Sequence, residues 1–428
     1  MLWLVILIPL FFTVRPTTGL PESGNKTLNL DRLDFFEHES GSRDPSPLPT
    51  TYEYEVEDDY GRSESYSYVI DAPDDDSAIS KRDKPTGLTI RQTNARRELM
   101  FNSQAKGSNI FNLLDFAYID YAGAGVTGGV TIYMHDSGIY LDHSEFKGKR
   151  PEGVLKPNVK RIIPEKSLKG NEFPQTKKDL NGHGTCVASK AIGLFYGVAK
   201  AASLKMVPWG DILNDDFMLT GLQAIIDDID RKIKQKGSKG FFPIVNFSYH
   251  LGTHVNTNLE LQNDYRKKYQ TMVDKGALLV VAAGNNGPGS VEYFPARFAQ
   301  EDSFIGNMIV VGGVDLVGKT WKDSVYGNLV HAWAPAIAED DSDDVKRKYI
   351  ACAGTANPTD VVLRSGTSLA APQVAGLAAY LYSTSATLQG KGAAWKVRAR
   401  ILEKSYPRTR GGYACIWNLL AGTECRFK

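Results

Sequence analysis

From about residue 105 onward, apolar runs of strand length alternate with amphipathic helical patterns, and no other feature constrains the fold as strongly. Apolar residues recur at helical spacing from Leu222 to Ile233 and from Leu259 to Val273, and each pattern ends at a glycine. Strands that are apolar on both faces are typical of a parallel sheet covered on two sides by helices. The sequence therefore predicts an α/β fold with a mostly parallel central sheet, its strands lying near residues 128–136, 202–209, 241–249, 277–284 and 307–315.

The chain begins with an apolar run, MLWLVILIPLFFTV, that is too short to span a bilayer and is typical of a secretory signal. We expect residues 1–19 to form a signal peptide that is cut after Gly19, although no Lys or Arg precedes the apolar run. A short membrane anchor is the alternative. The signal predicts a secreted, extracellular protein that is not embedded in a membrane.

Residues 20–80 carry 16 Asp and Glu against 4 Lys and Arg, whereas the whole chain has a formal net charge of only +1. The balanced total argues against nucleic-acid binding. The acidic segment has weak periodicity, so we expect it to be partly disordered, with one strand near residues 65–72. It ends at the dibasic pair Lys81-Arg82, which is either a processing site or two solvated charges. Segment 20–82 is therefore expected to be removable and to dock on the more basic remainder, residues 83–428.

Four cysteines are present, and a secreted protein can form disulfides. Cys415 and Cys425 are ten residues apart and are the expected bridge, which would stabilise the fold by about 2–3 kcal/mol. Cys186 and Cys352 either pair or remain buried thiols, and the sequence does not decide between the two.

Polar residues follow several of the expected elements, and ligands bind beyond the carboxyl ends of parallel strands. Asp136 ends the first strand, His183 stands between two glycines at an expected helix start, and Asn285 follows the most apolar strand. Each also has a structural interpretation, as a turn cap, a structural histidine and a turn former. Their shared position at strand and helix ends favours chemistry.

The segment RSGTSLAAPQVAG places Ser368 where another helix is expected to begin. Free N–H groups and the helix dipole would then lie beside its hydroxyl, and the Ser368 N–H and the Asn285 amide could bind an oxyanion. Pro372 is expected in the first helical turn. A role as the N-cap of the helix would explain the serine but not the other residues of this segment. With Asp136 orienting His183 and His183 removing the serine proton, Ser368 would be a nucleophile.

The segments HDSG, NGHGTCVA, AAGNNG and SGTSLAAPQVAG resemble the four motifs of subtilisin-like serine proteases, peptidase family S8. Together with RQTNARREL and FPARF, they look most similar to the fungal secreted, proteinase K-like branch. The resemblance covers roughly residues 85–428. It implies a three-layer α/β/α subtilisin-like fold for a peptidase domain at 83–428, and a secreted serine endopeptidase that works through an acyl-enzyme.

The resemblance also implies roles for individual residues and partners. The catalytic residues are Asp136, His183 and Ser368, the oxyanion residue is Asn285, and substrate contacts come from Ser248, Tyr249, His250 and Gly284. Expected partners are protein or peptide substrates, the chain's own propeptide at 20–82 and a kexin-like protease acting at Lys81-Arg82. We expect a monomer that requires no cofactor. Family members often bind structural calcium, but the sequence identifies no ligand set for it.

Several positions depart from the family pattern. His135 replaces an aliphatic residue and is expected to be a partly buried structural histidine that points away from the Asp136 face. His250 replaces a glycine at the wall of the specificity pocket and is expected to narrow or reroute binding. Gln373 replaces a histidine, with modest consequences expected. These changes and the unusual propeptide support the alternative of a catalytically impaired scaffold that acts as a secreted binding protein or decoy.

Two glycosylation sequons are present. The first, at Asn25, lies in the removable segment. The second, at Asn246, falls in an expected buried strand and is predicted to be unused.

Overall fold

The computed structural model describes residues 50–57, 63–71, 89–92, 95–104, 106, 118–121, 129–148, 157–174, 179–209, 214–237, 240–339, 341–343 and 348–419. The expected signal peptide at 1–19, the sequon at Asn25, the dibasic pair Lys81-Arg82 and Cys425 lie outside these residues.

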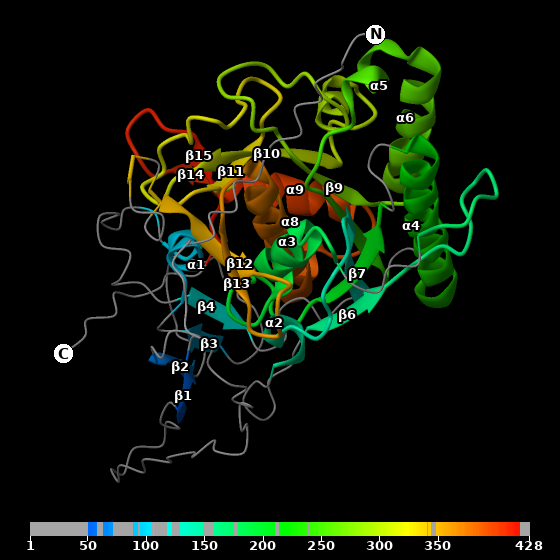
Figure 1. The fold of residues 1–428 in the computed structure, drawn as a ribbon. Coiled ribbons are helices and arrows are strands. Elements are labelled where there is room, and N and C mark those ends of the chain that lie inside the picture. Colours follow the sequence, from blue (N-terminus) through cyan, green and yellow to red (C-terminus); the bar gives the residue numbers. More distant parts are fainter. Residues whose placement is uncertain are drawn as a thin grey trace, which may run out of the picture.

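A central nine-stranded sheet organises the described residues (Figure 1). All neighbouring strands pair in parallel except β14, which is antiparallel to β15 at one edge. The predicted parallel sheet is therefore confirmed. Its strands, in spatial order, are β14 (Tyr406–Pro407), β15 (Ala414–Cys415), β11 (Ala332–Pro335), β10 (Met308–Val314), β9 (Leu278–Ala282), β8 (Phe242–Phe247), β5 (Val130–Asp136), β7 (Ser203–Pro208) and β6 (Asn158–Arg161).

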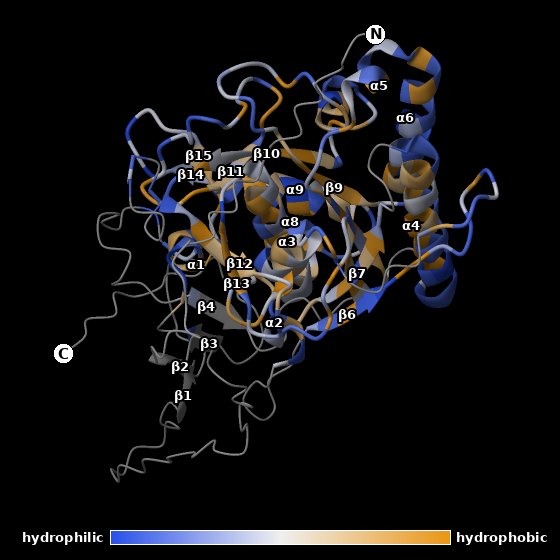
Figure 2. Cartoon of the chain, in the orientation of Figure 1, coloured by the Kyte–Doolittle hydropathy of each residue, from blue (hydrophilic) through white to orange (hydrophobic). Residues whose placement is uncertain are grey.

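Helices cover both faces of this sheet, as the apolar strands predict. On β5, Ile132 and Met134 contribute to a core shared with α3, α8 and α9, whereas Tyr133 contributes to a second core shared with α4 and α6. Figure 2 shows hydrophobic residues concentrated in the strands and on the helix sides that face them. The helices are α1 (Arg97–Asn102), α2 (Ser144–Lys147), α3 (His183–Ile192), α4 (Asp215–Lys236), α5 (Thr253–Thr257), α6 (Leu259–Asp274), α8 (Thr367–Thr384) and α9 (Ala393–Lys404).

The helix expected at Ser368 is α8, but it begins one residue earlier, at Thr367. Pro372 therefore lies inside the helix and not in its first turn, which corrects the expectation. A proline there cannot donate to the carbonyl four residues before it, that of Ser368. The Ser248 hydroxyl donates to this carbonyl instead, at 3.0 Å. The carbonyl is thus satisfied from outside the helix.

Part of the acidic segment forms a second, antiparallel sheet. The expected strand near 65–72 is β2 (Ser63–Asp71), but β1 (Thr50–Glu57) is also a strand, in a run that we expected to be disordered. The reason is that backbone pairing with β2 does not depend on the acidic composition of β1. The sheet continues through β3 (Thr89–Gln92) to β4 (Tyr118–Tyr121), so the acidic segment joins the remainder of the chain by strand pairing.

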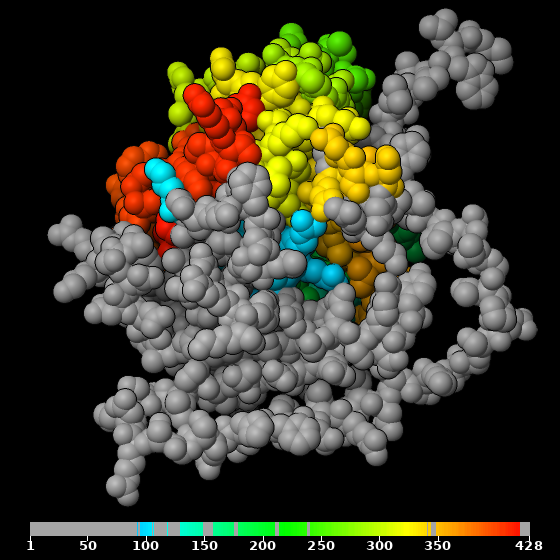
Figure 3. Space-filling model, turned by 90° about the vertical axis from the view of Figure 1, so that its left-hand side faces the viewer, coloured from blue at the N-terminus to red at the C-terminus, as the bar shows by residue number. Residues whose placement is uncertain are grey.

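The short helix α1 attaches the start of the 83–428 region to the body. Arg97 forms an ion pair with Glu339 at 2.9 Å, and Asn102 donates to Gln373 in α8 at 2.9 Å. On the face drawn in Figure 3, cyan atoms of this segment lie next to yellow and gold atoms from the last third of the chain. Among the described residues, no helix combines the length and the apolar character that a bilayer crossing requires.

Of the two alternatives left open for Cys186 and Cys352, the structure shows the disulfide, whereas Cys415 does not pair as expected. Cys186 in α3 is bonded to Cys352 in β12 (Ile350–Ala353), a strand that pairs with β13 (Val361–Arg364). Cys415 is a free, buried thiol, so the predicted bridge to Cys425 is absent from the structure. Burial raises the pKa of the Cys415 thiol to about 11. The thiol lies in the apolar cluster that also contains Cys186 and Cys352.

Candidate active site

Asp136 and His183 meet at the carboxyl end of β5. The Asp136 Oδ1 atom lies 2.7 Å from the His183 Nδ1 atom, and both side chains are buried. The Ser137 N–H also donates to Oδ1, at 2.7 Å. Because the carboxylate accepts a hydrogen bond from Nδ1–H, the neutral ring carries its hydrogen on Nδ1, and Nε2 is the nitrogen that can act as an acceptor. The pair is thus arranged as an oriented general base.

A second carboxylate, Asp179, connects the loops that carry this pair, and the sequence analysis missed it. Its Oδ1 accepts from the Ser137 hydroxyl and the Gly182 N–H, both at 2.9 Å. Its Oδ2 accepts from the Thr185 N–H at 2.8 Å and the Thr185 hydroxyl at 2.6 Å. Asp179 is fully buried. An acidic residue just before a helix start was the available signal, because such residues satisfy free N–H groups of the first turn.

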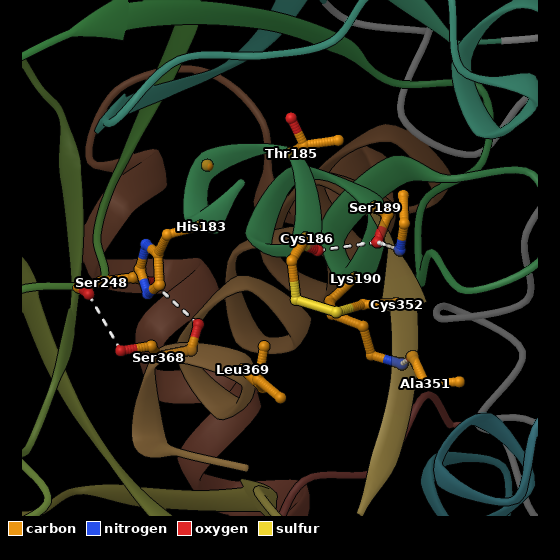
Figure 4. Close-up of a disulfide and its surroundings, with 12 residues drawn as sticks. His183, Thr185, Cys186, Ser189, Lys190, Ser248, Ala351, Cys352, Ser368 and Leu369 are labelled. Carbon is orange, nitrogen blue, oxygen red and sulfur yellow. Dashed lines mark hydrogen bonds between the residues drawn. A yellow bond between two sulfur atoms is a disulfide. The ribbon is translucent and has the colours of Figure 1, made fainter. Parts of the chain in front are cut away.

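Ser368 is the second residue of α8, and it is joined to Ser248 by two reciprocal hydrogen bonds. The Ser368 hydroxyl donates to the Ser248 carbonyl at 3.0 Å, and the Ser248 hydroxyl donates to the Ser368 carbonyl at 3.0 Å. The Asn246 amide in turn donates to the Ser248 hydroxyl at 2.9 Å. Figure 4 shows the His183 ring beside Ser368 and Ser248. The hydroxyl and the oriented imidazole therefore belong to one cluster of side chains.

Asn285 is held in a fixed orientation by Thr367, another residue that the sequence analysis missed. The Asn285 Oδ1 atom accepts from the Thr367 N–H at 2.9 Å and from the Thr367 hydroxyl at 2.8 Å. The Gly284 N–H donates to the Thr367 hydroxyl at 3.2 Å. With its oxygen engaged on one side, the amide presents Nδ2 on the other.

Gly366 keeps open the space that two N–H donors face. A Cβ atom placed on Gly366 would lie 3.4 Å from the Asn285 Nδ2 atom and 3.7 Å from the Ser368 nitrogen. Both donors therefore approach one small volume that is free of side chain. The backbone of Gly366 has a φ of +142°, which other residues rarely adopt. This arrangement is suited to binding a negatively charged oxygen.

Aromatic rings cover the histidine and the neighbouring strand end. Trp209 stacks on His183 with ring centroids 6.2 Å apart, and the Trp209 backbone N–H donates to the Asp136 carbonyl at 2.9 Å. Tyr249 is buried and meets Trp209 edge-on, with ring centroids 5.7 Å apart. His250 packs against Tyr293 with ring centroids 4.9 Å apart. Trp209 had no recognisable signal in the sequence, since its role depends on the position of the His183 ring.

His135 lies on the face opposite Asp136, as expected, but it is fully buried and not partly buried. Its Nδ1 atom is 2.8 Å from the Tyr249 hydroxyl, and a Cβ placed on Gly221 of α4 would lie 2.3 Å from its Nε2 atom. Close packing against α4 explains the complete burial. Burial lowers the pKa of His135 to about 3, so the ring is neutral and structural.

Gln373 connects three elements of the fold through hydrogen bonds. Its Nε2 donates to the carbonyls of Pro335 at 2.7 Å and Leu369 at 2.9 Å, and its Oε1 accepts from Asn102. It thereby joins α1, β11 and α8. Asn246, the residue of the second sequon, is fully buried in β8 as expected.

No group of three or more His, Cys, Asp and Glu side chains in the described part of the chain is arranged to hold a metal ion. Calcium binding elsewhere in the chain stays an expectation that derives from the family resemblance.

A buried Asp–His pair and a serine at a helix start, beside two N–H donors at the carboxyl edge of a parallel sheet, define an α/β/α protein with a site of the serine-hydrolase type. The chain belongs to the subtilase family, because the family model described as Peptidase S8, subtilase family, matches residues 127–413. The family resemblance and the fold predicted from it are therefore confirmed.

Individual relatives agree with this assignment. Subtilisin-like protease 1 of Pseudogymnoascus destructans is 33% identical over 279 residues, covering 65% of this chain and 56% of the relative. Subtilisin-like protease 2 of Arthroderma otae is 32% identical over 325 residues, covering 74% and 64%. The chain thus spans less than two thirds of the length of these relatives. A solved cold-adapted subtilisin-like serine proteinase shares the fold, with a TM-score of 0.51 at 20% identity over 77% of this chain and 98% of that one.

Proposed function

We propose that this chain is a secreted serine endopeptidase that hydrolyses peptide bonds of proteins. The observation that carries the proposal is the buried contact of 2.7 Å between Asp136 Oδ1 and His183 Nδ1, formed beside the helix start that holds Ser368. Such a pair orients an imidazole so that its second nitrogen, Nε2, can take a proton from a serine hydroxyl. Membership of the subtilase family supports the same activity.

In the proposed acylation step, the Ser368 hydroxyl leaves the Ser248 carbonyl and turns toward His183. His183 Nε2 takes the proton while Oγ attacks the carbonyl carbon of the peptide bond. The oxyanion of the tetrahedral intermediate accepts hydrogen bonds from the Ser368 N–H and the Asn285 Nδ2 group. Protonated His183, stabilised by Asp136, then gives its proton to the departing amine, which leaves an ester on Ser368.

Deacylation repeats these roles with water as the nucleophile. His183 removes a proton from water, the hydroxide adds to the ester, and the returning proton releases the Ser368 hydroxyl and the new carboxylic acid. Both half-reactions use the same base and the same N–H donors. The proposed chemistry therefore needs no group beyond the residues of the site.

Substrate binding is proposed along the ends of β8 and β9. Ser248, Tyr249 and His250 follow β8, and Gly284 follows β9, so an extended peptide could lie against them as an added strand. The contact between His250 and Tyr293 supports a narrowed pocket for the side chain that precedes the cleaved bond.

Secretion and maturation are parts of the same proposal. The apolar run at 1–19 would direct export, and a kexin-like protease would cut after Lys81-Arg82, where the acidic composition ends. The strand pairing between β2 and β3 offers the removable segment a way to stay docked on the remainder before release.

Replacement of Ser368 by Ala tests the proposal. We expect kcat for a peptide substrate to fall about 10⁶-fold, the loss measured for the same kind of substitution in a subtilisin. Ser383→Ala is the matched control, because Ser383 is another buried serine of α8, and its hydroxyl donates to the Tyr380 carbonyl of the same helix. Near-normal hydrolysis by Ser368→Ala would refute the assignment. Stable peptide binding by the processed wild-type protein without any cleavage of casein would support the alternative of a secreted binding protein.

A further inference from the structure

We propose that the Cys186–Cys352 disulfide is a positioning element for catalysis, which holds His183 and Ser368 in register. This proposal rests on the proposed protease function. The disulfide joins the helix that carries His183 to the hairpin that leads into the helix carrying Ser368 (Figure 4). It thus connects the helix that carries the base to the hairpin that directly precedes the helix carrying the nucleophile.

On the histidine side, the disulfide is one helical turn from the imidazole. His183 is the first residue of α3 and Cys186 is the fourth. Side chains three residues apart lie on neighbouring positions of a helix surface. A movement of the Cys186 backbone is therefore passed directly to the first turn, where the imidazole is attached.

On the serine side, the disulfide reaches Ser368 through strand pairing and through packing. Cys352 pairs with Val362, and Arg364 at the end of β13 is four residues before Ser368. In addition, Leu369, which follows Ser368 directly, lies in the same buried apolar cluster as both cysteines. Figure 4 shows Leu369 beside the disulfide.

Polar bonds at the neighbouring residues also align α3 with β12, and they remain when the disulfide is removed. The Ala353 N–H donates to the Ser189 hydroxyl at 3.1 Å, and Lys190 donates to the Ala351 carbonyl at 2.9 Å. Both contacts lie toward the far end of α3. They should preserve the fold when the disulfide is removed, so catalysis and folding can be measured separately.

The geometry of α3 explains why a small movement matters. Its far end is fixed against α8, since a Cβ on Gly376 would lie only 2.6 Å from the Ala191 carbonyl oxygen. His183 is eight residues from Ala191, which is about 12 Å along the helix axis. A tilt of about 5° about this contact would move the first turn by about 1 Å, and an error of that size can cost about 100-fold in rate.

The test compares the double variant Cys186→Ala/Cys352→Ala with the wild type and with Cys415→Ala. Cys415 is a free thiol in the same apolar cluster, so its variant removes a buried sulfur without breaking the bridge. At a temperature at which near-ultraviolet circular dichroism shows all three proteins folded, we expect kcat of the double variant to fall about 10- to 100-fold. KM should stay within about twofold, because the strand ends that bind substrate are unchanged. Cys415→Ala should keep the wild-type kcat.

A second measurement does not depend on turnover. The His183 Nδ1 proton that is shared with Asp136 should give a downfield proton resonance, identified by its loss in His183→Ala. We expect this resonance to shift or broaden in the double variant and to remain unchanged in Cys415→Ala. An unchanged kcat and an unchanged resonance in a double variant that only melts at a lower temperature would overturn the positioning role. If the wild type cleaves no substrate, the protease proposal fails, and the resonance alone decides whether the disulfide positions His183.

Discussion

Replacing Asp179 by Asn should weaken both the fold and the catalytic pair, because each carboxylate oxygen already accepts two hydrogen bonds. Oδ1 accepts from Ser137 and Gly182, and Oδ2 accepts from the N–H and hydroxyl of Thr185. An asparagine has one oxygen and one NH₂ group, so either orientation turns NH₂ toward two donors. The hydroxyls can rotate, but one backbone N–H, that of Gly182 or Thr185, loses its acceptor in either case.

The expected magnitude follows from the number of bonds that are lost. Each hydrogen bond to a charged group contributes about 1.5–3 kcal/mol, so the loss of the acceptor of one backbone N–H should lower the free energy of unfolding by at least about 1.5–3 kcal/mol. Asp179 is fully buried, and solvent screening does not reduce this value. Because Gly182 and Thr185 flank His183, we also expect kcat to fall at least about tenfold, the lower end of what misplacing a catalytic group costs.

Urea unfolding followed by tryptophan fluorescence, together with initial rates over a range of peptide concentrations, measures both effects. Asp264→Asn is the control, because Asp264 is a half-exposed surface carboxylate paired with Lys267 at 3.4 Å. The control should lie within about 0.5 kcal/mol of the wild type. An Asp179→Asn protein with the stability and kcat of the wild type would refute the role given to this carboxylate.

Two further predictions concern the oxyanion site and a buried acid. Asn285→Ala should lower kcat about 100- to 1,000-fold with little change in KM, a range measured on a subtilisin for loss of one such donor; a parallel rise in KM would contradict it. Burial raises the pKa of Glu145 from 4.5 to about 7, so between these pH values the folded state binds more protons than the unfolded state and stability falls as pH rises. Glu145→Gln keeps an acceptor for the N–H groups of Phe195 and Tyr196. Urea unfolding of this variant should show no such fall in the free energy of unfolding between pH 4.5 and 7. A pH dependence equal to that of the wild type would contradict the role given to Glu145.

The parallel sheet and the position of His183 could be predicted because they follow from local patterns. Strands such as β9 are apolar throughout, which is the property that burial on two faces requires. The two glycines around His183 mark a loop that ends at a helix, and α3 begins at that residue. Short strands such as β14 and β15 were missed, because two residues are too few to show any periodicity.

Features that depend on distant partners could not be predicted. Thr367 and Asp179 have their roles only because donors and acceptors from other loops reach them. The pairing of Cys186 with Cys352 crosses 166 residues, and no local pattern encodes such a distance. The expected bridge at Cys415 was wrong, because Cys415 is buried as a free thiol in the apolar cluster that contains the Cys186–Cys352 disulfide.

The most direct measurement of the proposed chemistry is the site at which a fluorophosphonate bonds to the purified, processed protein, mapped by mass spectrometry of its peptides. If Asp136 and His183 activate one hydroxyl among all the serines, the modification will be found on Ser368 alone and will disappear in His183→Ala. Modification of a different serine, or equal labelling of Ser368 with and without His183, would contradict the proposed protease function.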